Sequence, residues 1–83
     1  MKKGDLVQTL DANGEIRGLG LFMGSFVPAE RGMTAYEMID QSEQCDQTSV
    51  SINTRTKHFE VFIDGNVRYM NAVYWSLLPV SDD

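Results

Sequence analysis

The sequence predicts an all-β fold, a small SH3-like barrel of about five bent antiparallel strands. Two apolar-alternating runs, residues 59–63 and 67–70, flank Asp64-Gly65, and Asp-Gly is a strong signal for a tight hairpin turn. The runs at residues 4–7 and 77–80 are typical of the opening and closing strands of such a barrel. Further short apolar runs are separated by glycines and by an Asn-Gly pair, as in all-β chains.

The length of 83 residues predicts one domain, residues 1–83, with residues 81–83 as a solvated tail. Four Phe, three Tyr and one Trp suffice for one compact core. No apolar run approaches the roughly 20 residues needed to cross a bilayer. The positive start at Lys2-Lys3 has no apolar region behind it, so we expect no secretory signal. We therefore expect a cytoplasmic protein with no membrane partner.

The first two strands are expected on either side of a turn at Asn13-Gly14. Residues 6–10 form the first strand, opened by Gly4-Asp5. Residues 19–27 form the second, and Gly24 lies in its middle. Glycine inside a strand marks a bulge or a sharp bend, so we expect the barrel wall to bend there. Pro28 ends this run.

Residues 28–58 are predicted as an enlarged loop between the second and third barrel strands. The part from residue 29 to 47 holds five acidic residues against one basic residue, Arg31. Thr34 and Glu37 have the spacing of a capping box and favour a helical turn. Tyr36 and Met38 also suit a strand edge, so both alternatives stand. Val50 and Ile52 alternate with serine as a strand would.

The C-terminal hairpin places Phe59, Val61 and Ile63 on one face. On the return strand, Val67 and Tyr69 alternate with Arg68 and Met70. Phe62 and Met70 fall on the nominally polar phase, so apolar contacts are expected on both faces. Residues 71–76 are predicted as a single 3₁₀ turn packed on the barrel end. Pro79 is compatible with the last strand because that strand can be an edge.

The residues at 3–7, 18–21, 61–69 and 78–80 together carry a resemblance. This pattern of a Gly-Asp-Leu-Val opening, a glycine-flanked strand, an Asp-Gly hairpin and a final strand after a 3₁₀ turn resembles small SH3-like barrel proteins. Such proteins are common among tailed phages, including those of marine cyanobacteria. The resemblance covers about half of the chain and leaves out residues 28–58. It implies a phage-encoded binding or structural module without enzymatic activity.

The net charge of −5 disfavours nucleic acid as a partner, because nucleic-acid binders present a basic surface. Arg55, Lys57 and Arg68 are expected close together around the hairpin and are the strongest candidates for a basic strip. The opening strand is also similar to that of KOW-type and Tudor-like barrels, some of which bind nucleic acid. A nucleic-acid-associated barrel is therefore the alternative function.

No catalytic, cofactor or metal site is predicted. Cys45 and His58 are the chain's single cysteine and histidine, and no motif positions an Asn or Asp to orient the imidazole. We expect a surface histidine and a free thiol. Residues 40–46 resemble a calcium loop only superficially, because the glycine and the terminal glutamate that such a loop requires are missing. A solvated acidic loop is expected instead.

Four aromatic residues are the candidate partner-binding site: Tyr36, Tyr69, Tyr74 and Trp75. Exposed aromatic rings between the loops of a small barrel can form a groove for extended peptides. In the favoured arrangement Trp75 instead plugs the barrel end while Tyr74 covers its rim. The aromatic pattern of proline-binding signalling domains is absent. The expected partner is therefore another protein or a second copy, the latter as a dimer formed through the edge at residues 50–52.

Overall fold

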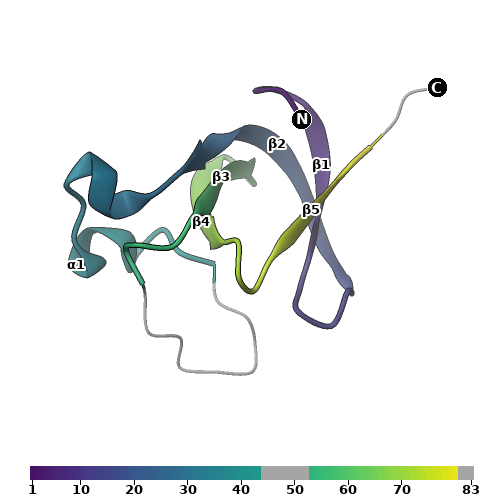
Figure 1. Cartoon of the computed structure of the whole chain (residues 1–83). Helices are drawn as coiled ribbons and strands as arrows, with labels where there is room; N and C mark the ends of the chain where they lie inside the picture. The colour runs from purple at the N-terminus through teal and green to yellow at the C-terminus, as the bar shows by residue number, and fades with distance from the viewer. Residues whose placement is uncertain (44–52, 81–83) are drawn as a thin grey trace.

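The computed structural model describes residues 1–43 and 53–80, which form one sheet of five antiparallel strands (Figure 1). The strand order is β4-β3-β2-β1-β5. The strands are β1 (Leu6–Leu10), β2 (Ile16–Phe26), β3 (His58–Ile63), β4 (Asn66–Asn71) and β5 (Ser76–Pro79). This arrangement, with little helix, confirms the predicted all-β, barrel-like fold.

The long strand β2 joins the two halves of the sheet. Its first half pairs with β1 and its second half with β3. The register against β3 shifts between Phe22 and Gly24, and Gly24 has a φ of +128°. A non-glycine residue rarely adopts this φ, so the glycine permits the bulge that bends β2. The bend predicted at Gly24 is confirmed, and Figure 1 shows β2 running from the β1 side to the β3 side.

The two predicted turns lie where the sequence places them. Gly14 has a φ of 81° in the turn between β1 and β2. Asp64 and Gly65 form the two-residue connection between β3 and β4, with φ values of 52° and 85°. Positive φ at both positions is the geometry of a type I′ hairpin turn, whose twist matches that of the strands.

The core lies on the inner face of the bent sheet. Its buried members are Val7, Phe22, Val61, Met70 and Trp75. Phe59 and Ile63 pack against them, as the alternation of β3 predicts. On β4 it is Met70 that enters the core. Met70 belongs to the alternating set of positions interpreted as polar in the sequence. The expectation of apolar residues on both faces of this hairpin is confirmed.

The enlarged loop contains a 3₁₀ helix, η1 (Pro28–Arg31), and a short helix, α1 (Ala35–Met38). The Thr34 side chain accepts a hydrogen bond from the Glu37 N–H, so the helical alternative is the correct one. The side chain of Met38 is fully buried. Residues 44–52, which include the strand-like pattern at Val50 and Ile52, lie outside the described residues.

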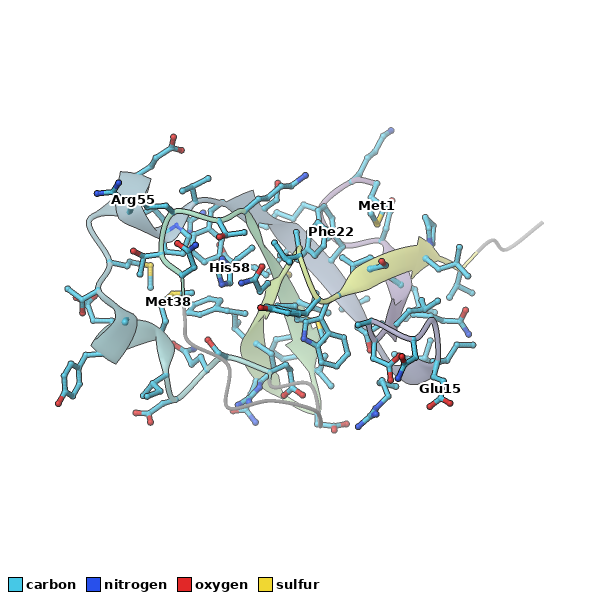
Figure 2. All side chains as sticks on the ribbon, turned by 60° about the horizontal axis from the view of Figure 1, so that its bottom comes forward. Met1, Glu15, Phe22, Met38, Arg55 and His58 are labelled. Atoms are coloured by element: carbon cyan, nitrogen blue, oxygen red, sulfur yellow. The ribbon has the colours of Figure 1, made fainter. Side chains whose placement is uncertain are left out.

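His58 corrects two sequence-based expectations. It belongs to β3, so the loop ends one residue earlier than predicted. It is also 2% exposed, hence not a surface histidine. Its Nδ1 lies 2.8 Å from the Thr56 carbonyl oxygen, and its ring stands 6.1 Å from that of Phe26. Figure 2 shows His58 and Met38 on the same side of the molecule, where the loop covers the end of the sheet.

The chain turns once between β4 and β5. The Tyr74 N–H donates to the Asn71 carbonyl at 3.0 Å, the bond of a single 3₁₀ turn. The Trp75 N–H reaches the same carbonyl at 2.9 Å. The 3₁₀ helix itself lies at Pro28–Arg31 rather than here. Among the described residues, no helix is long and apolar enough to cross a membrane.

Candidate functional site

The outer face of the sheet carries a group of large apolar side chains that the chain leaves exposed. Leu6 on β1 pairs with Leu21 on β2, which pairs with Phe62 on β3. Directly paired residues point to the same side of a sheet, so these three side chains form a row. We define the outer apolar face as six residues whose exposed fractions range from 36% to 54%: Leu6, Leu19, Leu21, Phe62, Leu78 and Val80.

The members of the outer apolar face are neighbours. The Val80 N–H donates to the Leu6 carbonyl, which extends the row onto the end of β5. Leu19 and Leu78 each pair with Gln8 of β1, and so form a second row beside the first. Side chains in paired positions lie about 5 Å apart at Cβ. The result is an apolar surface that spans several strands and contains one polar side chain, Gln8.

This face was missed in the sequence because the run from Leu19 onward was interpreted as one apolar strand without assigned faces. The sequence signal for this face is that apolar residues occupy both alternating sets of positions along the strands. Val7 and Gly20 point inward, whereas their neighbours Leu6 and Leu21 point outward. Apolar residues on both phases are typical of strands that are covered on both sides. A sheet normally covers such a face with a further layer, and exposed apolar patches mark interaction sites.

The β4 edge of the sheet is occupied by the chain's own loop. The Tyr69 N–H donates to the Gln41 carbonyl at 2.7 Å, and the Glu43 N–H donates to the Tyr69 carbonyl at 2.9 Å. Arg68 stabilises the contact of residues 41–43 with β4, because its Nε donates a hydrogen bond to the Glu43 carboxylate at 2.6 Å. The same guanidinium donates to the carbonyl oxygens of Asp40 and Ser42.

Pro79 limits backbone pairing at the β5 edge of the sheet. Because Val80 points its N–H toward β1, its neighbour Pro79 faces the open side of the strand. Proline has no N–H to offer to an added strand. Neither edge of the described sheet therefore presents an open row of backbone donors.

The structure does not gather the four predicted aromatic residues into one groove. Trp75 is 4% exposed and lies in the core, so its ring is not presented to a ligand. Tyr69 packs its ring against Phe26 at 5.2 Å on the outer side of β4. Tyr36 is 89% exposed on α1, and Tyr74 is 36% exposed in the turn before β5. The arrangement with Trp75 as the barrel plug agrees with these positions.

Three arginines are held by carboxylates. Arg17 binds Asp11 at 3.2 Å, Arg31 binds Glu60 at 2.6 Å and also lies over the Phe26 ring, and Arg68 binds Glu43. Lys57 and Arg68 lie about four positions apart along the hairpin, roughly 13 Å in an extended strand. Lys57 and Arg68 therefore do not lie next to each other in a compact basic strip.

Asp11 organises the turn between β1 and β2. Its carboxylate accepts hydrogen bonds from the backbone N–H groups of Asn13 and Glu15 and from the Arg17 guanidinium. Desolvation of the buried side chain acts to raise the pKa of Asp11, but these donors outweigh it and hold the pKa below its ordinary value. The network is explained by the turn that it stabilises.

The described residues contain no group of three or more His, Cys, Asp or Glu side chains that could hold a metal ion. Cys45 lies outside the described residues, as does the part of the superficial calcium loop that follows Glu43. His58, buried beneath the loop, has its Nδ1 engaged by the Thr56 carbonyl.

The comparisons with known proteins add no relative. No protein-family model matches the chain, and neither a curated protein nor a solved structure does so. The resemblance to small SH3-like phage proteins therefore stays a prediction, and the functional argument rests on the surface of this molecule.

Proposed function

We propose that this protein is a non-enzymatic interaction or structural module whose outer apolar face binds a protein partner, either another protein or a second copy of itself. One observation carries the proposal: six large apolar side chains are exposed together on one face of the described sheet, while Tyr69 on the β4 edge is bonded to the loop and Pro79 on the β5 edge has no N–H to offer. Cytoplasmic location and phage origin are parts of the same proposal, supported by the sequence features given above.

The energetics favour a contact that buries the whole face. Complete burial of a Leu or Phe side chain contributes about 1.5–3 kcal/mol, so a side chain that is half exposed can still contribute about 1 kcal/mol. Association itself costs at least about 4 kcal/mol in lost freedom of motion. A partner that touches one or two of these side chains would gain too little, whereas one that covers all six can form a stable complex.

The test is photo-cross-linking in cells that express the protein with a photoreactive amino acid in place of Leu78. We expect a discrete cross-linked product, which Leu19→Gln should abolish. Ile39→Gln is the matched control, because Ile39 on the loop is 53% exposed and Leu19 is 54% exposed. Absence of any product, or equal loss with both variants, would contradict docking through this face.

Nucleic acid is a poor candidate as the partner. Binding to phosphates is rewarded when several Lys or Arg side chains converge and release counterions. Arg68 is instead held by Glu43, and the chain carries a net charge of −5. We expect no micromolar binding to duplex or single-stranded DNA at physiological salt. Such binding, lost when Arg55, Lys57 and Arg68 are neutralised together, would favour the nucleic-acid alternative.

A further inference from the structure

We propose that Asn13 is a site of spontaneous deamidation, and that the Asp11 side chain sets its rate by holding the turn in an unreactive conformation. Asparagine is among the chemically labile residues. Asn13 precedes Gly14, and both are exposed in the turn between β1 and β2. Figure 2 shows this turn, marked by Glu15, far from the loop that contains Met38. The inference concerns a modification of the chain and does not depend on the proposed docking role.

The reaction needs only the chain and water. The backbone nitrogen of Gly14 gives up its proton to hydroxide and attacks the side-chain carbonyl carbon of Asn13. A new nitrogen–carbon bond forms, the bond from that carbon to the side-chain nitrogen breaks, and ammonia leaves behind a succinimide ring. Water then opens the ring at one of its two carbonyl groups. One opening gives aspartate at position 13, and the other gives isoaspartate, whose main chain runs through the former side chain.

Gly14 is the feature that makes Asn13 the most reactive asparagine. Gly14 has no side chain, and a Cβ atom built on it would meet nothing within 4 Å apart from its chain neighbours. Asn53, Asn66 and Asn71 each precede a residue that carries a Cβ atom, which crowds the attacking nitrogen. Asn13 is therefore expected to react first once its backbone is free to rotate.

The folded turn restrains the attacking nitrogen. The Gly14 N–H donates a hydrogen bond to the Asp11 carbonyl oxygen at 3.0 Å. Ring closure requires rotation about the Cα–C bond of Asn13, which turns the Gly14 nitrogen toward the Asn13 side chain. This hydrogen bond must break during that rotation and before the nitrogen can lose its proton. The native turn is therefore an unreactive conformation.

The Asp11 carboxylate holds the chain on both sides of the same peptide group. Its Oδ1 atom accepts hydrogen bonds from the Asn13 N–H at 2.9 Å and from the Glu15 N–H at 3.0 Å. We call these two bonds the Asp11 clamp. The two donors lie immediately before and after the Asn13–Gly14 peptide group, so the clamp opposes the rotation that ring closure requires. Arg17 binds the other carboxylate oxygen, Oδ2, at 3.2 Å and helps to keep the carboxylate in place.

The modification would change the hairpin that contains it. Both products replace a neutral amide by a carboxylate in a turn that already contains Asp11 and Glu15. Isoaspartate also lengthens the main chain of the turn by one carbon atom. The Asp11 N–H donates to the Glu15 carbonyl oxygen at 3.0 Å, and this bond closes the turn across the lengthened segment. The register of a hairpin depends on the length of its loop, so isoaspartate disturbs the pairing of β1 with β2.

Peptide mass spectrometry, applied while the full chain is incubated in mildly alkaline buffer, measures deamidation at Asn13. Asp11→Ala should raise the rate at least about tenfold, because one hydrogen bond can contribute about that factor and two are lost. Asp11→Asn keeps an oxygen that can accept both bonds, so its rate should lie between those of the wild type and Asp11→Ala. Asp5→Ala is the matched control and should leave the rate unchanged. It removes a carboxylate that binds a backbone N–H, that of Lys2, in a different turn.

A second comparison separates the clamp from unfolding of the whole chain. Gly20→Ala introduces a clash between β2 and β3, away from the turn, and should leave the rate at Asn13 unchanged. In concentrated urea, the wild type and Asp11→Ala should react at one common, faster rate, because neither retains the clamp. Equal acceleration by Gly20→Ala and Asp11→Ala, or equal rates for the folded wild type and Asp11→Ala, would overturn the role of the clamp. Deamidation that appears first at another asparagine would overturn the site.

Discussion

Gly20 lies so close to Val61 that a Cβ atom built on the glycine would stand 2.6 Å from the Val61 Cγ1 atom. The same Cβ would meet Ile63 Cγ1 at 2.8 Å and the Phe62 carbonyl oxygen at 2.8 Å. Real side chains do not approach one another so closely. Gly20 therefore allows β2 and β3 to close around the core, and its absent side chain is a requirement of the fold.

Gly20→Ala should destabilise the protein by about 1–3 kcal/mol, because the added methyl group forces the Val61 and Ile63 side chains or the β3 backbone to move. The measurement is urea unfolding followed by the fluorescence of Trp75. Gly18→Ala is the matched control on the same strand. Its Cβ would meet only Thr9 Oγ1, at an ordinary 3.7 Å, so a change within about 0.5 kcal/mol is expected. Equal effects would contradict the packing.

Gly65→Val should destabilise the hairpin by about 1–2 kcal/mol, because Gly65 has a φ of 85° and a β-branched residue is strained there. Gly65→Asn is the comparison, since asparagine tolerates the left-handed region better. Thermal melting should rank the wild type above the Asn variant and the Asn variant above the Val variant. An unchanged melting temperature for Gly65→Val would show that the turn is placed wrongly.

Asp11→Asn should reduce stability at neutral pH and flatten the acid side of the stability profile. Because the pKa of Asp11 is lowered in the folded state, its contribution is present above the unfolded pKa of about 3.9 and is lost as the pH falls through the folded value. Unfolding by urea at a series of pH values from 7 downward measures this. Asp64→Asn, in a turn where asparagine is equally suited, removes one carboxylate without touching the Asp11 network.

Arg68→Met should loosen the loop from β4 while leaving the barrel folded. Removal of a partly exposed ion pair and two carbonyl contacts is expected to cost about 1 kcal/mol. The direct measurement is amide hydrogen exchange at Tyr69 and Glu43, whose N–H groups join the loop to the strand. We expect faster exchange at both amides. Arg55→Met, in the exposed turn before β3, should leave these rates unchanged.

Local sequence signals were sufficient for the turns and the bulge. Gly65 and Gly14 adopt the positive φ that their Asp-Gly and Asn-Gly pairs predict, and Gly24 lies where the register of β2 shifts. The position of Trp75 as a core residue was also accessible, since a short aromatic segment before a closing strand must pack on the barrel end. These features depend on the φ preferences of a few residues and on neighbours close in the chain.

It was harder to predict which β4 side chains face the core and whether the loop is helical or extended. Val67 and Met70 are both apolar, so alternation alone could not show that Met70 enters the core. Thr34 and Tyr36 supported a helix and a strand equally. The helix prevails in the structure, where the Thr34 side chain caps it and Met38 is buried beneath the loop.

The sequence by itself determined an all-β chain with its hairpins, its bend and its inward-facing Val61, because these follow from backbone preferences and a period of two. Only the tertiary structure decided which apolar residues remain exposed. Leu19 and Val61 are equally apolar in the sequence, yet Leu19 is 54% exposed and Val61 is fully buried. The difference arises because burial depends on what covers each face once distant strands pair. The pairing of β1 with β5 and of β2 with β3 joins segments far apart in the chain, so no local pattern encodes it.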